Sequence, residues 1–198
     1  GIAKNTIIIF MSDNGGLSAH ARAGKAHTHN APLNSGKGSA YEGGIREPML
    51  VRWPGVTKAG SSCNQYIIIE DFFPTILSLA NVKAAKKVQH VDGISFTGLL
   101  KNPQTKRSSR NLYWHFPNNW GPAGPGIGAT STIRSGDWKL IYYYKDARSE
   151  LFNIKDDIGE KNNLAQQYPA KVKILADQLR GYLKEVKAQR PVYQSTGK

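Results

Sequence analysis

The first hydrophobic segment of the chain is a run of apolar and β-branched residues from Thr6 to Phe10. Polar residues do not alternate with apolar ones in this run, which is typical of a strand buried on both faces of a parallel sheet. The run leads into Ser12, Asp13, Asn14 and two glycines. Ligands of open α/β sheets bind at the carboxyl ends of strands, so Asp13 and Asn14 lie where a site is expected.

Between the first strand and residue 110, the sequence predicts a loop, a short strand, a helix and a basic segment. A long polar loop at residues 17–44 follows the first strand, and loops of this length are usually functional or mobile. Met49 to Trp53 predicts a short strand, and Asp71 to Ala80 has the spacing of a buried helix. From Lys83 to Arg110 the chain is basic and is expected to be loop-like.

The last part of the chain predicts a small sheet and one helix. Residues from Trp114 to Thr132 are rich in Gly, Pro and Asn and predict an extended loop. Three strand signals separated by turns then predict an antiparallel meander: Thr132–Arg134, Trp138–Tyr144 and Glu150–Ile154. An apolar stripe between Pro169 and Pro191 predicts an amphipathic helix, and its members recur at three and four residues: Val172, Leu175, Leu179, Tyr182, Leu183 and Val186.

These patterns predict an α/β protein with two parts. Residues 1–110 are expected to form part of an α/β domain, and residues 111–198 a small antiparallel sheet packed by the C-terminal helix.

The charge of the chain favours anionic partners. Lys and Arg total 27 against 14 Asp and Glu, which gives a formal net charge of +13. Nucleic acid, anionic lipid and sulfated or phosphorylated sugars would all suit such a surface. No aromatic binding signature, zinc spacing or recognition helix supports nucleic acid. No apolar run approaches the roughly 20 residues that a membrane span needs.

Asp13 and Asn14 form the first candidate site. A carboxylate and an amide carbonyl side by side are hard oxygen ligands that suit Ca²⁺ or Mg²⁺. Calcium takes about six to eight oxygen ligands, so most would have to come from elsewhere, including the substrate. An ordinary Asn-Gly turn would have the same sequence.

Lys37 is the centre of the second candidate site, in the segment Gly36-Lys37-Gly38-Ser39. The flanking glycines let the backbone pass close to a ligand and let the ammonium group reach an oxyanion. The segment is not a nucleotide P-loop, because the strand-to-helix setting is missing. A surface turn is the alternative interpretation.

Together the two segments resemble the type I sulfatases of the alkaline-phosphatase-like superfamily. The resemblance rests on Asp-Asn-Gly-Gly at the end of an Ile-rich strand, followed by the segments 32–39 and 41–48 in this order and spacing. Further segments fit the same family: Asp71–Leu77, Ile133–Leu140, Glu150–Asn153 and Asp157–Leu164. Nearly the whole chain resembles the family's C-terminal portion, and most of all the carbohydrate-sulfate branch that includes N-acetylgalactosamine-6-sulfatase.

The resemblance implies roles for individual residues. Asp13 and Asn14 match two ligands of the family's calcium ion, and Lys37 matches the lysine that contacts the sulfate. Charge spreads over the sulfate oxygens during sulfuryl transfer, so a fixed cation is most useful there. His115 lies in an aromatic segment that related enzymes place near the substrate pocket, and a packed histidine is the alternative.

The resemblance also implies that the nucleophile lies outside these residues. The family uses a formylglycine made from Cys or Ser in a Cys/Ser-x-Pro-x-Arg motif, which this chain lacks. Cys63 is followed by Asn64, Gln65 and Tyr66, so it cannot be the modified residue. We therefore expect the chain alone to be inactive and to need an N-terminal part of the same enzyme. A periplasmic or secreted location is implied by the family only.

Two other functions stay open at this point. A phosphatase or phosphodiesterase of the same superfamily would share the fold, and a non-catalytic polyanion-binding module would share the charge. Several further residues have structural interpretations: Glu42 and Arg46 as a pair holding the Lys37 loop, Asp71 as a helix cap, and Asp156, Asp157 and Glu160 as a solvated acidic turn.

Overall fold

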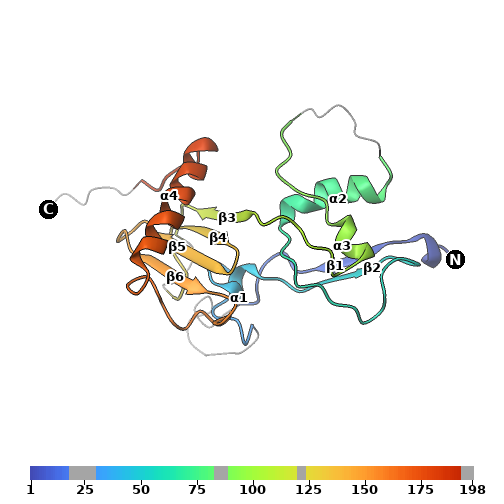
Figure 1. The fold of residues 1–198 in the computed structure, drawn as a ribbon, viewed down its shortest axis with the longest axis horizontal. Coiled ribbons are helices and arrows are strands. Elements are labelled where there is room, and N and C mark those ends of the chain that lie inside the picture. Colours follow the sequence, from blue (N-terminus) through green and yellow to red (C-terminus); the bar gives the residue numbers. More distant parts are fainter. Residues whose placement is uncertain (18–29, 83–88, 120–123, 193–198) are drawn as a thin grey trace. The chain divides into compact units, whose positions relative to one another are not determined.

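The computed structural model describes residues 1–17, 30–82, 89–119 and 124–192. The chain divides into two compact units (Figure 1). The first unit contains Gly1–Met11 and Met49–Ser108, and the second contains Ser12–Pro48 and Ser109–Lys198. The predicted domains, residues 1–110 and 111–198, stay a prediction. Within the described ranges, no helix has both the length and the apolar composition that crossing a membrane requires.

The first unit contains a two-stranded sheet, preceded by a short 3₁₀ helix, η1 (Ala3–Asn5). Strand β1 (Ile8–Met11) pairs antiparallel with β2 (Met49–Arg52). Ile8 and Phe10 are 52% and 62% exposed. The prediction that this strand is buried on both faces of a parallel sheet is therefore wrong for this chain, because its described residues provide no layer over that face.

One 3₁₀ helix and two α-helices complete the described part of the first unit. The 3₁₀ helix η3 (Ile69–Asp71) leads into α2 (Phe72–Leu79), and α3 (Thr97–Lys101) follows later in the chain. The helix predicted between Asp71 and Ala80 is confirmed. It is buried only on one side, because Phe73 and Ile76 remain more than half exposed.

Asp71 connects the start of α2 to the segment before α3. Its buried Oδ1 accepts a hydrogen bond from Ile94 N at 2.8 Å, and its Oδ2 accepts one from Ile68 N at 3.3 Å. No side-chain hydrogen bond from Asp71 caps α2. The interpretation as a cap of that helix is therefore wrong, and Asp71 instead joins two segments far apart in sequence.

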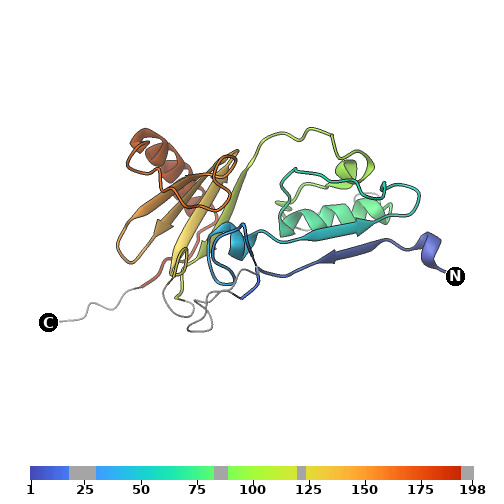
Figure 2. The same cartoon turned by 90° about the horizontal axis from the view of Figure 1, so that it is seen from below.

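The second unit is built on a four-stranded antiparallel sheet with strand order β3-β4-β5-β6. Its strands are β3 (Asn111–Phe116), β4 (Thr130–Ser135), β5 (Trp138–Tyr143) and β6 (Ser149–Asn153). The long helix α4 (Pro169–Glu185) lies against one face of this sheet (Figures 1 and 2). The predicted meander and helix are confirmed, but β3 was missed because part of it was assigned to a loop.

The sheet has a different apolar layer on each face. Residues of one face pack with the stripe of α4 to form one core cluster: Ile133, Leu140, Leu151, Leu175, Leu179 and Leu183. Residues of the other face pack with the segment just before α1 (Glu42–Ile45) to form a second cluster: Ala40, Tyr41, Ile141, Tyr143, Phe152 and Ile154. Because side chains alternate along a strand, the sheet holds the helix on one face and the Lys37 segment on the other.

We predict that Leu179→Ala lowers the free energy of unfolding by about 2–5 kcal/mol, because it leaves a cavity under α4. Leu179 is 3% exposed, whereas Ile174 on the same helix is 54% exposed. Ile174→Ala is the matched control and should change the urea midpoint little. Equal losses in the two variants would contradict the packing described for α4.

Candidate functional site

Backbone hydrogen bonds join the two candidate segments of the sequence. Gly15 N donates to Gly44 O at 3.1 Å, and Lys37 N donates to Gly16 O at 3.0 Å. The loop that carries Asp13 therefore contacts the following segment at two places, Lys37 and Gly44. The structure thus brings the two candidate segments into contact, and the roles of Asp13, Asn14 and Lys37 stay a prediction.

Glycine is required where the two segments meet and inside the segment that carries Lys37, because the backbones approach too closely for a side chain. A Cβ built on Gly15 would lie 1.8 Å from Gly43 O, and one built on Gly43 would lie 2.2 Å from Asn34 O. A Cβ on Gly44 would lie 2.2 Å from Ser39 O. Each contact is with backbone, which cannot move aside as a flexible side chain can. The glycines thus allow the site to form.

Gly15→Ala should destabilise the chain by about 1–3 kcal/mol or more, because the new methyl group overlaps the Gly43 carbonyl. Gly181→Ala is a control that we expect to change the stability in the opposite direction. Gly181 lies inside α4 with open space around it, so alanine there should stabilise by up to about 1 kcal/mol. Thermal unfolding of both variants tests the junction, and a Gly15→Ala variant as stable as the unsubstituted chain would contradict it.

Asn30 holds the same junction through its side chain. Its Oδ1 accepts a hydrogen bond from Gly16 N at 3.0 Å, and its Nδ2 donates to Gly16 O at 2.9 Å and to Ser35 O at 2.9 Å. Asn30 was not predicted as part of the junction, since no motif in the sequence marks it. An amide in a glycine-rich loop was the only signal.

The three candidate side chains differ in their surroundings. Asp13 is exposed, and Asn14 donates from Nδ2 to Gly15 O at 3.1 Å, which leaves its carbonyl oxygen available. Lys37 is half-buried, and its ammonium makes no ion pair with any residue that the structure describes. An amide oxygen, a carboxylate and a cation that has no ion-pair partner among the described residues are therefore held on adjoining loops.

Glu47 adds a second carboxylate near Asp13. Its Oε1 is buried and has no hydrogen-bond partner in the described part of the chain. Burial, and then the nearby negative charge of Asp13, raise the pKa of the Glu47 carboxyl. A cation near these oxygens would relieve both effects, so the donor set fits a hard metal ion such as calcium. The fit is partial, because the described residues contain no group of three or more His, Cys, Asp or Glu that could hold a metal.

A buried charge cluster fixes the Lys37 segment to the sheet. Glu42, the first residue of α1, accepts hydrogen bonds from Arg134 Nη1 at 3.2 Å and from Lys139 Nζ at 3.0 Å. Lys139 Nζ also pairs with Glu160 Oε1 at 2.8 Å, and Glu160 Oε2 accepts a hydrogen bond from Glu42 N. Glu42, Arg134, Lys139 and Glu160 are all at most 4% exposed.

The cluster changes two interpretations made from the sequence. Glu42 does pair with Arg46, at 3.7 Å, but its closer partners are Arg134 and Lys139 on the sheet. Glu160 is not part of a solvated acidic turn, because it is 3% exposed and faces Lys139. The two basic residues were missed because alternation along the strands does not tell which polar positions face inward.

The pKa values of the two buried carboxyl groups, Glu42 and Glu160, are shifted in opposite directions. Burial opposes the charge of Glu42, but Lys139 and Arg134 outweigh it and hold the pKa of Glu42 below its ordinary value. Burial raises the pKa of Glu160, and Lys139 offsets only part of that shift. The ionised form of Glu42 therefore stabilises the fold, whereas the ionised form of Glu160 is disfavoured in it.

Glu42→Gln should lower the free energy of unfolding at about pH 7 by about 3–5 kcal/mol, because Lys139 and Arg134 lose a buried partner. Glu160→Gln should lower the free energy of unfolding by less than Glu42→Gln does. The contribution of Glu42 is lost as the pH falls through its lowered folded pKa, so the deficit of Glu42→Gln should narrow toward about pH 3 and below. Urea unfolding at both pH values tests this, and a larger loss for Glu160→Gln at neutral pH would contradict it.

His115 lies on β3 and not in a loop, opposite Ser131 of β4. Its Nε2 is 2.6 Å from Gln189 O and its Nδ1 is 2.7 Å from Ser131 Oγ. A carbonyl can only accept, so Nε2 carries a hydrogen and the neutral ring can accept from Ser131 at Nδ1. The imidazole thereby fastens the segment after α4 to the sheet.

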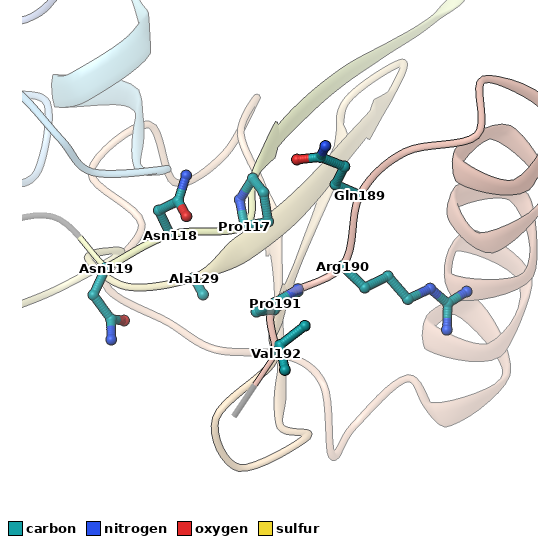
Figure 3. A pocket seen from close by; sticks show the side chains of 8 residues that line it. All are labelled: Pro117, Asn118, Asn119, Ala129, Gln189, Arg190, Pro191 and Val192. Carbon is teal, nitrogen blue, oxygen red and sulfur yellow. The ribbon is translucent and has the colours of Figure 1, made fainter. Parts of the chain in front are cut away.

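The segment that His115 fastens lines a pocket of about 410 Å³ (Figure 3). Its walls come from the residues after β3, the residue before β4 and the residues after α4: Pro117, Asn118, Asn119, Ala129, Gln189, Arg190, Pro191 and Val192. The guanidinium group of Arg190 extends away from Asn118 and Asn119 (Figure 3). The polar side chains of Asn118, Asn119 and Arg190 thus do not converge on one point of the pocket (Figure 3).

Comparison with known proteins finds sulfatases that are similar to most of this chain. Residues 36–189 match the family described as N-sulphoglucosamine sulphohydrolase, C-terminal. A sulfatase of Formosa agariphila is 37% identical over 175 residues, which are 86% of this chain and 30% of that protein. The N-acetylglucosamine-6-O-sulfatase of Bacteroides thetaiotaomicron is 31% identical over 202 residues, 99% of this chain and 33% of that protein.

Solved structures agree with the sequence relatives. Ps i-CgsB in complex with k-i-k-neocarrahexaose is 30% identical and matches 98% of this chain and 40% of that one, with a TM-score of 0.69. BT4656 in complex with its substrate D-glucosamine-2-N,6-O-disulfate is 30% identical and matches 96% of this chain and 36% of that one, with a TM-score of 0.68. The chain thus spans about a third of the length of the sulfatases it matches.

Proposed function

Because the chain belongs to the sulfatase family whose C-terminal region its residues 36–189 match, we propose that it contributes part of the active site of an enzyme that hydrolyses sulfate esters of carbohydrates. The observation that carries the proposal is the hydrogen-bonded junction between the Asp13 loop and the Lys37 segment. Relatives named for N-acetylglucosamine and N-acetylgalactosamine sulfates support a sugar substrate.

Lys37 binds the sulfate group in this proposal. Its backbone N–H is bonded to Gly16 O, and its ammonium is without an ion-pair partner among the described residues. A cation fixed in this way stabilises the negative charge that spreads over the sulfate oxygens as the sulfur–oxygen bond breaks. The glycines on either side leave room for the substrate to approach.

Asp13 and Asn14 would hold the metal ion, which in this family we propose to be calcium. When bound, calcium supplies a Lewis acid and a template for the sulfate oxygens. The side-chain carbonyl oxygen of Asn14, whose Nδ2 donates to Gly15 O, and the exposed carboxylate of Asp13 are suitable ligands. The orphaned oxygen of Glu47 beside Asp13 supports a cation at this place.

The nucleophile would come from sequence outside these residues. No Cys/Ser-x-Pro-x-Arg motif occurs in the chain, and Cys63 is an exposed free thiol outside any such motif. We propose a formylglycine in an N-terminal part of the enzyme, so that the chain alone is inactive. We propose further that the enzyme is periplasmic or secreted, an inference that rests on its family alone.

His115 contributes to substrate binding indirectly in this proposal. Both ring nitrogens already have partners in the chain, so the imidazole has no hydrogen-bonding group left for a sugar. By holding Gln189, it keeps one wall of the pocket at residues 189–192 in place. The substrate-binding role predicted for His115 would thus be exerted through the pocket wall that it positions.

We predict that Lys37→Ala lowers kcat/KM for a sulfated sugar by about 100- to 1000-fold in a sulfatase that carries this chain as its C-terminal region. The Formosa agariphila sulfatase, with residues 1–198 in place of the region they match, provides such an enzyme. Lys58→Ala removes an equal charge at an exposed position and should leave the rate unchanged. Full activity of Lys37→Ala would overturn the assigned role.

A further inference from the structure

The side-chain amide of Asn30 binds three backbone groups that belong to the two segments of the candidate site. Its Oδ1 accepts a hydrogen bond from Gly16 N at 3.0 Å, and its Nδ2 donates to Gly16 O and to Ser35 O, both at 2.9 Å. A side-chain amide has two N–H donors, so both donors of Asn30 are used. Exchanging Oδ1 and Nδ2 would place an oxygen against two carbonyl oxygens. The amide therefore fits this place in one orientation only.

Gly16 lies at the centre of these contacts. Asn30 binds both its N–H and its C=O group, and the same carbonyl oxygen accepts from Lys37 N at 3.0 Å. Gly16 follows Asn14 by two residues, so the amide fixes the backbone directly after the predicted metal ligands. One uncharged side chain thereby links the loop of these ligands to the backbone of Lys37.

Ser35, the third backbone partner, has an unfavourable conformation. Its φ angle is 61°, in the left-handed region that residues with a side chain rarely adopt. Backbone in such a region persists only where the surrounding structure holds it. Asn30 binds the carbonyl group of Ser35 two residues before Lys37. Loss of that hydrogen bond would let the turn relax and would move Lys37.

From these contacts we infer that Asn30 is a positioning residue, which aligns Lys37 with the loop of the predicted metal ligands so that one sulfate group meets both. The inference rests on the proposed function for the roles of Lys37 and of that loop. Asn30 is uncharged and both its donors are bound within the chain, so it acts through geometry. Groups that orient the ligands of a metal ion contribute about 10- to 100-fold to affinity or activity.

The test replaces Asn30 in the Formosa agariphila sulfatase that carries residues 1–198 as its C-terminal region. Asn30→Ala should lower kcat for a sulfated sugar by about 10- to 100-fold, because the Lys37 ammonium is displaced from the charge that develops in the transition state. KM should change much less than kcat, since the lost interaction belongs to the transition state. The dissociation constant of calcium, measured by calorimetry on the metal-free hybrid without substrate, should rise by about 10-fold or more.

Asn163→Ala is the matched control, because Asn163 also joins backbone segments through its side chain. Its Oδ1 accepts hydrogen bonds from Leu151 N and from Ala165 N, both at 3.0 Å. This variant should be less stable than the unsubstituted hybrid but should keep its kcat and its calcium affinity at temperatures where it is folded. A folded Asn30→Ala hybrid that keeps both values as well would overturn the inference.

A hybrid that fails to fold leaves a measurement on the 198-residue chain itself. Amide hydrogen exchange, followed by NMR, reports the loss of individual backbone hydrogen bonds. Asn30→Ala should remove the protection of the Gly16 and Lys37 amides and leave that of Leu140 in β5 unchanged. A Lys37 amide that stays protected in the variant would overturn the inference, because its position would then not depend on Asn30.

Lys37→Ala in the same hybrid separates the role of Asn30 from the proposed function. Full activity of Lys37→Ala would refute the proposed function, whatever the effect of Asn30→Ala. A large loss with Lys37→Ala, together with unchanged kcat and calcium affinity in Asn30→Ala, would refute the role of Asn30 alone.

Discussion

The second unit depends on the position of one buried cation, the ammonium group of Lys139. It lies between Glu42 at 3.0 Å and Glu160 at 2.8 Å, and all three side chains are withdrawn from water. An isolated charge at such a position would be costly, so each of the three needs the others. Glu42 begins α1, Lys139 belongs to β5, and Glu160 precedes α4. The pairing therefore ties the glycine-rich segment to the sheet.

Apolar contacts in the same region also hold the glycine-rich segment against the sheet. Tyr41 packs edge to face on Phe152, and its hydroxyl donates to Glu150 at 2.8 Å. Charged and apolar contacts thus hold residues 40–46 against one face of the sheet, while α4 covers the other. The Lys37 loop ends where this anchored segment begins, so its position is set by the sheet. Backbone hydrogen bonds then place the Asp13 loop on it.

The sequence could predict much of this arrangement and not all of it. The stripe of α4 and the turns of the meander follow from spacing, and the order of the two glycine-rich segments indicated the family. The inward positions of Arg134 and Lys139 could not be predicted, because their partners are 92 and 97 residues away from them in the chain. His115 was assigned to a loop since its strand follows no alternation, and its pairing with β4 is non-local. The buried state expected for β1 depends on a layer that these residues do not supply.

The central claim is that Asp13, Asn14 and Lys37 belong to one site for a sulfate ester and a metal ion. The most direct measurement is a crystal structure of a sulfatase containing this chain, with calcium and sulfate bound. The account predicts the Lys37 Nζ within hydrogen-bond distance of a sulfate oxygen, and oxygens of Asp13 and Asn14 at about 2.3–2.6 Å from the calcium ion. A metal ion coordinated by other residues, with Lys37 directed away from the sulfate, would contradict it.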